Sequence, residues 1–458
     1  MAFRPLNILE HETQTLISAE RRLMAEPECI KIRFAKALRA HLDNDLVTAE
    51  KLYREIILET PHEAQAKHYL GFVLQQTDHL VEAAEQISSA IALDNSHAEW
   101  HFNLGIILSR QGLTSSAIDA FSHAIELDPD KYFYWTNLGA AFESGEEWER
   151  AEQCYTTATR IDPNCPDAFY LLSTLYIKLA RFPEARHNNY CGIIAMPENH
   201  PSKIVLGQAY YELGRIDEAI AVFEDWLLAE PSNPVATHLL AAYRKQQAPE
   251  QCTSQYIEHT FDAFANTFEH ILGRLKYCGP QLVQAYLTTV NFPPASLNIL
   301  DLGCGTGLVG EVLSSHASML TGVDLSQPML DQAATKQVYH QLHKSDIRDF
   351  LLVCDAEYDL ISCMDTLIYL GRIDEVLALI YQRLKIGGIF MFSTEKLATT
   401  NKLGYQLNIS GRYSHHDGYL RSLLIGTGFR MDWVADVPIR TESGCPIAGQ
   451  FICVSRIR

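Results

Sequence analysis

A glycine-rich turn is the feature of this sequence with the clearest chemical potential. It lies in the stretch NILDLGCGTGLVGEVL, residues 298–313, between an apolar run and a stretch with helical character. Glycines let a ligand approach the backbone closely, and the free N–H groups at the start of a helix can bind it. Acidic residues accompany the turn, because Asp301 precedes the glycines and Asp324 closes the next apolar run. This arrangement predicts a site for a nucleotide-like ligand.

Two ligands fit the letters of this turn. GTGLVG has the form G-x-G-x-x-G of a dinucleotide site, whereas DLGCGTG has the form D-x-G-x-G-x-G used for S-adenosylmethionine. Asp301 can anchor the ammonium group of a methionine but offers nothing to a pyrophosphate. Asp324 can accept from the ribose hydroxyls of either ligand, and KSDIRDF offers Asp346 for an adenine amino group and Ile347 for its ring. The sequence therefore favours S-adenosylmethionine, with a ligand-free turn as the alternative.

The segment ahead of the turn predicts a helical cover for the site. In YIEHTFDAFANTFEHILGRLKYCGPQLV, Phe261, Phe264 and Phe268 recur at helical spacing. Such a stripe either packs in an ordinary core or forms, with Tyr277, a lid over the cofactor. The sequence leaves both interpretations open.

The second half of the chain must form the sheet that positions these residues. Apolar runs alternate there with helical stretches, which predicts a parallel sheet with helices on both faces. The strand-like runs are Leu297–Leu300, Met319–Val323, Tyr358–Met364 and Gly388–Ser393. Two extended segments, DWVADVPIR and GQFICVSRI, flank the turn residues 443–446 and predict a terminal antiparallel hairpin.

The first half of the chain is a repeat of 34 residues. Alignment of the chain on itself at this shift brings small residues, large apolar residues and prolines into registered columns. The column of small residues is Ala37, Gly71, Gly105, Gly139, Ser173, Gly207 and Ala241. Small residues allow two helices to cross closely, and proline marks the point where one helix has ended. This tetratricopeptide (TPR) pattern predicts six repeats over Ile30–Asn233 and a capping helix over Pro234–Gln247.

A stack of such repeats has a concave face that can bind a peptide or a protein. Asn103 and Asn137 hold equivalent places in two Asn-Leu-Gly triplets, so we expect their amides to lie one above the other on that face. There they could hydrogen-bond the backbone of an extended ligand. The alternative is that asparagine is simply common at this point of the repeat.

Composition limits the partners and the compartment. The net charge is −19, and the first 248 residues hold 21 basic against 35 acidic residues. Such a field disfavours nucleic-acid phosphate, although an acidic balance also serves solubility. The eleven cysteines lack the spacing of a metal site or a disulfide framework. No signal segment or membrane-length apolar span is visible. We expect a cytoplasmic protein with no metal and with neither nucleic acid nor membrane as partner.

The chain resembles the TPR-containing class I S-adenosylmethionine-dependent methyltransferases of bacteria. The resemblance rests on the repeats and on DLGCGTG, VDLS, CMDTLIYLG, LKIGGIFMFSTE and SGRYSHHDGYLRSLLIGTGF. It implies an all-α TPR superhelix followed by a Rossmann-like α/β domain with a seven-stranded sheet and an antiparallel last strand. It also implies that Asp301, Gly303 and Gly305 line the methionine part and that Asp365 faces the methyl group and the acceptor. The full predicted cofactor set is Asp301, Gly303, Cys304, Gly305, Asp324, Leu325, Asp346, Ile347 and Tyr277.

The predicted domains follow from these patterns. They are an N-terminal helical segment over 1–29, the TPR domain over 30–248, linker and lid helices over 249–290, and the methyltransferase domain over 291–458. No D-P-P-Y or N-P-P-Y motif occurs in the chain, which argues against amino-methylation of adenine or glutamine amide.

Methyl transfer is an in-line displacement, so the site must align the reacting atoms and exclude water. A base is needed only if the acceptor must lose a proton. The segment SGRYSHHDGYL has polar residues between two glycines, which predicts a loop that closes over substrate. We predict that Tyr413 and His415 face the methyl group, that Arg412 holds a carboxylate of substrate or cofactor, and that His416 points outward. The catalytic candidates are Tyr413, His415 and Asp365, and the substrate-binding candidates are Asn103, Asn137, Arg412 and Tyr369.

The sequence thus predicts a methyltransferase whose repeats recruit a peptide or protein acceptor. One alternative is a small-metabolite methyltransferase whose repeats serve oligomerisation or localisation. Another is a scaffold that has kept the fold without turnover, and the joint presence of Asp301, Asp324 and Asp346 argues against it. The sequence does not determine the acceptor atom.

Overall fold

The computed structural model describes residues 28–244, 249–290, 292–399, 401–442 and 445–457. The chain divides into two compact units, one up to Pro201 and one from Ser202 onward. This division lies ahead of the predicted boundary at residue 248, so the last repeat shares a unit with the sheet. Most of the predicted N-terminal helical segment, residues 1–27, lies outside the described residues.

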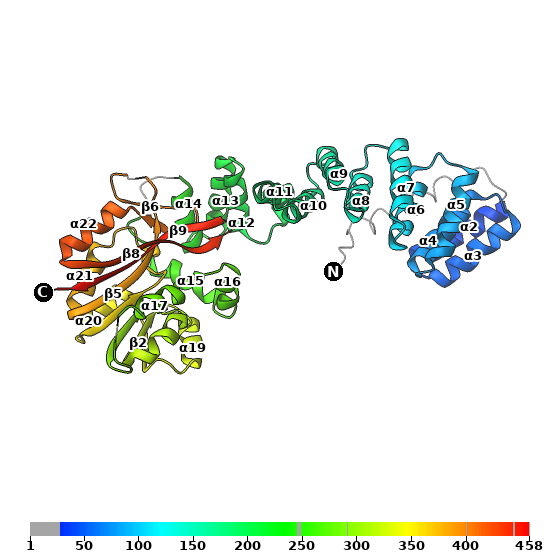
Figure 1. Ribbon diagram of the computed structural model, residues 1–458. Coiled ribbons are helices and arrows are strands. Elements are labelled where there is room, and N and C mark those ends of the chain that lie inside the picture. The colour runs from blue at the N-terminus through cyan, green and yellow to red at the C-terminus, as the bar shows by residue number, and fades with distance from the viewer. Residues whose placement is uncertain (1–27, 245–248, 291, 400, 443–444, 458) are drawn as a thin grey trace. The chain divides into compact units, whose positions relative to one another are not determined.

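The predicted repeats are present as paired helices (Figure 1). Within the described residues the pairs are α2 (Glu28–Leu42) with α3 (Leu46–Glu59), α4 (Ala64–Gln76) with α5 (Leu80–Leu93), α6 (Ala98–Arg110) with α7 (Thr114–Leu127), α8 (Tyr132–Ser144) with α9 (Trp148–Ile161), α10 (Pro166–Lys178) with α11 (Phe182–Ala195), and α12 (Lys203–Glu212) with α13 (Ile216–Ala229). The short helix η1 (Pro197–Asn199) precedes the sixth pair, and α14 (Pro234–Arg244) follows it. Six helix pairs and a following helix, described as far as Arg244, thus lie where the sequence predicts the repeats and the capping helix.

The column of small residues lies where the two helices of a pair cross. A Cβ atom at Gly71 would come within 2.5 Å of Ile87 Cγ1, and one at Gly105 within 2.5 Å of Phe121 Cε1. In the fifth pair, Ser173 takes the same place and donates its hydroxyl to the carbonyl oxygen of Ala185 at 2.8 Å. Close packing at the crossing therefore explains why this column holds glycine and other small residues.

The second unit contains a single sheet, which has nine strands among the residues that the structure describes. They are β1 (Leu297–Leu302), β2 (Ala317–Asp324), β3 (Gln341–Lys344), β4 (Tyr358–Cys363), β5 (Leu384–Lys396), β6 (Tyr405–Leu407), β7 (Tyr413–His415), β8 (Phe429–Glu442) and β9 (Cys445–Arg456). The strands β3-β2-β1-β4-β5 are parallel, β9 runs antiparallel to β5, and β8 runs antiparallel to β9. This confirms the predicted sheet with its reversed last strand and terminal hairpin.

The hairpin β6–β7 is an addition to that sheet. β7 pairs in parallel with the last two residues of β5, and β6 pairs antiparallel with β7. The sequence analysis predicted neither strand, nor the short strand β3.

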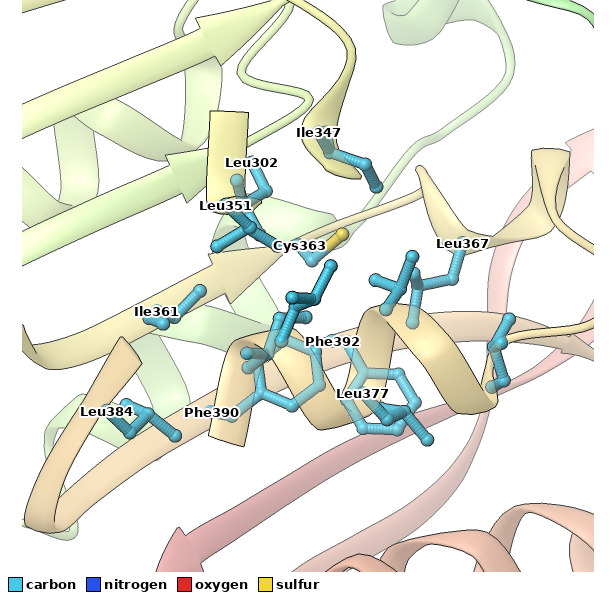
Figure 2. Close-up of a cluster of buried hydrophobic side chains, with 14 of the residues drawn as sticks. Leu302, Ile347, Leu351, Ile361, Cys363, Leu367, Leu377, Leu384, Phe390 and Phe392 are labelled. Carbon is cyan, nitrogen blue, oxygen red and sulfur yellow. The ribbon is translucent and has the colours of Figure 1, made fainter. Parts of the chain in front are cut away.

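Helices cover both faces of the sheet (Figure 1). The helices α17 (Gly279–Leu287) and α18 (Leu308–Leu313) cover one face, and α20 (Ile347–Val353), α21 (Asp374–Arg383) and α22 (Asp417–Thr427) cover the other. Leu300 and Leu302 of β1 pack on the second face and Ile299 on the first, because successive side chains of a strand point to opposite faces. Figure 2 shows this second core, with Phe390 and Phe392 of β5 near Leu377 of α21.

The remaining helices of this unit lie at the ends of strands or ahead of the sheet. They are α15 (Ser254–Phe264), α16 (Phe268–Arg274), η2 (Ser314–His316), α19 (Gln327–Thr335) and η3 (Leu367–Tyr369). None of the helices in the described part of the chain combines the length and apolar character needed to cross a membrane.

Candidate active site

The glycine turn between β1 and α18 has a backbone that only glycine adopts easily. The φ angles of Gly303, Gly305 and Gly307 are 67°, 54° and 87°, in the left-handed region. A Cβ atom at Gly303 would lie 2.1 Å from the Thr366 hydroxyl, whereas one at Gly305 would meet only Phe268, at 3.7 Å. Gly303 is therefore packed against protein, while the backbone at Gly305 adjoins open space that a ligand can fill.

Asp301 is buried at the end of β1 and is held by two hydroxyl groups. Tyr339 donates to one carboxylate oxygen at 2.7 Å, and Ser362 donates to the other. Tyr339 fits because residue 310 is glycine, where a Cβ atom would lie 2.2 Å from its hydroxyl. Burial raises the pKa of Asp301 to about 6, although the two hydroxyls oppose this rise. A cation that enters the site would therefore stabilise the ionised carboxylate.

Two further carboxylates end strands beside the turn. Asp324 accepts from the backbone N–H groups of Gly305 at 2.8 Å and Ser326 at 2.9 Å, so it ties the end of β2 to the glycine turn. Burial raises the pKa of Asp324. Asp346 caps α20 by accepting from the backbone N–H of Arg348 at 2.9 Å.

These groups meet in one cavity of about 270 Å³. The cavity lining includes every residue of the predicted cofactor set: Asp301, Gly303, Cys304, Gly305, Asp324, Leu325, Asp346, Ile347 and Tyr277. The carboxyl ends of the parallel strands β1, β2 and β3 bring most of these residues together, although they are far apart in sequence. This is where open α/β sheets bind their ligands.

The helices α15 and α16 cover this cavity. Phe261, Phe264 and Phe268 all line it, which supports the predicted lid over ordinary core packing. Several polar contacts tie the lid to the sheet and to α19. Among them, Asp262 contacts Ser326 Oγ at 2.5 Å, Glu258 contacts Lys344 at 2.5 Å, and Glu269 contacts Lys336 at 2.9 Å.

A buried charge cluster forms another part of the cavity wall. Arg440 donates to Asp365 at 2.8 and 3.1 Å, to Glu442 at 2.7 Å, and to Glu395. Arg412 donates to Glu395 at 2.8 Å and also to Glu442. The cluster thus holds two guanidinium groups and three carboxylates.

Asp365 has an unusual backbone for a non-glycine residue, with φ at 53°. Its N–H donates to Ser393 Oγ at 2.8 Å, and its carboxylate lies in the cavity lining. Burial raises the pKa of Asp365, and the charges of Arg440 and Arg412 oppose this rise. The sequence analysis identified Asp365 but missed Arg440, Glu395 and Glu442. The signal was weak, because Arg440 and Glu442 are two of several charged residues in the segment that forms β8.

Two tyrosines line the same cavity as the charge cluster. Tyr277 and Tyr369 both line it, and neither hydroxyl has a hydrogen-bond partner among the described residues. Burial raises the pKa of both phenols, so both stay protonated and can donate a hydrogen bond. The sequence predicted both residues at the site.

The structure does not bring Tyr413 and His415 to the cavity. Both are fully buried. Tyr413 donates to the carbonyl oxygen of Pro249 at 2.5 Å, and His415 Nε2 lies 3.1 Å from the carbonyl oxygen of Gly371. Burial lowers the pKa of His415 to about 4. The prediction that these side chains face the transferred methyl does not agree with this placement.

The predicted closing loop is also wrong, because its central residues form β7. Pairing with β5 fixes these residues as a strand. Arg412, directly ahead of β7, does line the cavity, but its guanidinium holds Glu395 and Glu442 of this chain. His416 is partly buried and caps α22 by accepting from the N–H of Gly418.

Asn103 and Asn137 lie in α6 and α8, in the first unit. The amide nitrogen of Asn103 is 3.0 Å from His68 Nε2, and that of Asn137 donates to the carbonyl oxygen of Phe133 at 2.7 Å. Both side chains are half-buried. Their part in ligand binding stays a prediction.

Comparison with known proteins agrees with this geometry. Residues 299–388 match the family model for a methyltransferase domain, and residues 74–132, 135–167 and 200–233 match tetratricopeptide repeat models. The chain therefore carries a methyltransferase domain together with TPR repeats.

Two curated relatives are themselves named as methyltransferases. A malonyl-[acyl-carrier protein] O-methyltransferase of Bacillus cereus is 39% identical over 104 residues, 22% of this chain and 38% of the relative. A ubiquinone biosynthesis O-methyltransferase of Coxiella burnetii is 34% identical over 102 residues, 21% of this chain and 43% of the relative. The chain thus spans about two fifths of the length of these relatives.

Solved structures also include partial matches to this chain. The magnesium protoporphyrin IX methyltransferase of Synechocystis, solved with bound SAH, is 17% identical. The match covers 44% of this chain and 99% of that chain, with a TM-score of 0.36.

Proposed function

We propose that this protein transfers a methyl group from S-adenosylmethionine to an acceptor in the cavity beneath α15 and α16. The observation that carries the proposal is the open backbone of the glycine turn beside the buried carboxylate Asp301. S-adenosylmethionine carries positive charges on its sulfur and on its ammonium group, and the buried carboxylate Asp301 is held by two neutral hydroxyls, with no cationic partner among the described residues. Asp324 and Asp346 line the same cavity, where their carboxylates could accept hydrogen bonds from the ribose hydroxyls and the adenine amino group.

The bound cofactor would supply a methyl group on a positively charged sulfur. The chain's own residues would then align the acceptor and exclude water. Tyr277 and Tyr369 can donate hydrogen bonds to the acceptor, and Asp365 is the carboxylate at this end that can take a proton from it. No histidine lines the cavity in the described residues, so the proposal needs no imidazole base.

The repeats support a finer proposal, that the acceptor is a peptide or a protein. Equivalent helices carry Asn103 and Asn137, and each amide keeps an oxygen without a hydrogen-bond partner among the described residues. Such oxygens can accept from the backbone N–H groups of an extended peptide. A small-metabolite acceptor remains the alternative.

Calorimetry with S-adenosylhomocysteine tests the cofactor. We expect binding to the full chain, and at least about tenfold weaker binding to Asp324→Ala, because the turn and the ribose lose a charged acceptor. Asp331→Ala is the matched control, since Asp331 is exposed on α19 and lies outside the cavity lining. Tight NAD binding without any response to S-adenosylhomocysteine would overturn the proposal.

Radiolabelled S-adenosylmethionine tests the acceptor class. After incubation with the protein and a dialysed cell lysate, we expect the label in the macromolecular fraction. The double substitution Asn103→Ala and Asn137→Ala should reduce that label while S-adenosylhomocysteine affinity is unchanged. Label confined to small molecules would favour the metabolite alternative.

A further inference from the structure

The capping helix of the repeats contacts the sheet domain at a specific point. His238 of α14 is 5% exposed, and its Nε2 lies 2.9 Å from the carbonyl oxygen of Gly411, in the turn between β6 and β7. Figure 1 shows α14 next to β6, within the second unit. Gly411 has a φ of 78°, and a Cβ atom there would lie 2.3 Å from the Tyr256 hydroxyl. The turn is thus packed against α14 and α15 without room for a side chain.

Further contacts hold the same hairpin. The rings of His238 and Tyr256 lie 4.2 Å apart, and Cys252 Sγ is 3.6 Å from the carbonyl oxygen of Gly411. On the next strand, Tyr413 donates to the carbonyl oxygen of Pro249 at 2.5 Å. The hairpin β6–β7 is therefore fixed from outside the sheet by residues that precede the methyltransferase domain.

This hairpin places a residue of the cavity wall. Gly411 is followed directly by Arg412, which lines the cavity and holds Glu395 and Glu442. These two carboxylates also hold Arg440, and Arg440 holds Asp365. A continuous path thus runs from the capping helix to Asp365 in the cavity wall. It consists of the hydrogen bond to Gly411, the peptide bond to Arg412, and the ion pairs of the charge cluster.

We propose that His238 is a positioning residue for methyl transfer, acting through Gly411 and Arg412 on the acceptor end of the site. The proposal rests on the methyltransferase function proposed above. It implies that the capping helix of the repeats completes the active site, beyond any role in recruiting the acceptor.

The chemistry of His238 suits a fixed hydrogen-bond donor. Burial lowers its pKa, although the hydrogen bond to Gly411 opposes this change, so the imidazole is neutral at pH 7. A neutral ring must carry its proton on Nε2 to donate to the Gly411 carbonyl. A phenylalanine would keep a ring against Tyr256 without the donor, whereas a glutamine would keep a donor in a similar position.

The test compares His238→Phe with His238→Gln in the full chain. Hydrogen–deuterium exchange of residues 405–416 reports the hairpin, calorimetry with S-adenosylhomocysteine reports the cofactor site, and labelled S-adenosylmethionine with dialysed lysate reports the rate. For His238→Phe we expect faster exchange in 405–416, a rate at least about tenfold lower, and cofactor affinity within about twofold of wild type. His238→Gln should restore both exchange and rate.

The matched control is His41→Phe. His41 is a histidine of α2 that is 4% exposed, with Nε2 3.2 Å from the Gln76 side chain, in the first unit. The substitution His41→Phe should leave hydrogen–deuterium exchange in residues 405–416 and the rate of methyl transfer unchanged. A second variant, Tyr413→Phe, loosens the hairpin from its other contact and should also speed exchange and slow transfer.

Two results would overturn the proposal. One is wild-type exchange in residues 405–416 for both His238→Phe and Tyr413→Phe. The other is faster exchange with an unchanged rate of transfer. Failure of the wild-type chain to bind S-adenosylhomocysteine would instead refute the proposed function, which the exchange measurement does not require.

Discussion

Asp301→Asn replaces a buried carboxylate with a neutral amide of the same shape. The pKa of Asp301 is about 6 in the folded protein, against an ordinary value of 3.8, because burial disfavours the charge. Above pH 6 the ionised carboxylate therefore destabilises the folded state without ligand. We expect the substitution to stabilise the protein at pH 7 and to weaken cofactor binding at the same time.

The magnitude follows from the shift in pKa. A rise of about two pKa units corresponds to about 3 kcal/mol. Between pH 4 and 6 the folded state keeps a proton that the unfolded state has lost, so wild-type stability from this group falls as the pH rises through this window. The amide carries no such dependence. It does lose one hydrogen bond, because only the amide oxygen can accept, whereas Tyr339 and Ser362 donate to different oxygens of the carboxylate; this costs about 1 kcal/mol.

The assay is urea unfolding of the wild type and of Asp301→Asn at pH 4, 5, 6 and 7. The stability of the variant relative to wild type should rise by about 2 kcal/mol between pH 4 and pH 7, because the unfolded carboxyl is already more than half ionised at pH 4. Asp331→Asn, at an exposed site on α19, is the control and should show a flat difference. A flat difference for Asp301→Asn as well would refute the reasoning. At pH 7 the same variant should bind S-adenosylhomocysteine about 100-fold more weakly, because the ammonium group loses its charged partner.

Three more substitutions separate packing, hydroxyl chemistry and charge. Gly105→Val should destabilise the repeats by about 1 to 3 kcal/mol in thermal unfolding, because its side chain would overlap Phe121, while S-adenosylhomocysteine affinity stays the same. Tyr277→Phe should slow methyl transfer about tenfold without changing the unfolding temperature, since its hydroxyl has no partner to lose among the described residues; a large drop in that temperature would contradict this. Arg440→Met should cost about 3 to 5 kcal/mol at pH 7, because it leaves the buried Asp365 without a cationic partner, and less at pH 5, since burial raises the pKa of Asp365 and favours its protonated form; equal losses at both pH values would count against an electrostatic origin.

Periodic and local features could be predicted well from the sequence. The period of 34 residues predicted the six helix pairs. It is visible in the sequence because each small residue packs against the second helix of its own pair, as Gly105 packs against Phe121. The glycine turn could also be predicted, since the left-handed backbone of Gly303 and Gly305 restricts the residue type at each position. Asp324 and Asp346 could be placed because a parallel sheet brings the carboxyl ends of its strands to one edge.

Features that depend on distant pairing could not be predicted. Tyr339 is a single tyrosine in a polar stretch, and only the folded chain brings its hydroxyl to Asp301 through the space left by Gly310. Arg440 and Glu395 are 45 residues apart in the chain, and they meet because β5 and β8 both pair with β9 and so lie in the same part of the sheet.

Tyr413 and His415 were predicted at the site but do not lie there. Their polar neighbours and flanking glycines indicated a loop, but pairing of β7 with β5 buried both side chains away from the cavity. The sequence by itself determined the repeats, the turn and the strand-end carboxylates, because these depend on local conformation and period. The tertiary structure decided which charges meet, which hydroxyls stay free and which helix holds Gly411, because burial and pairing depend on contacts between residues far apart in the chain.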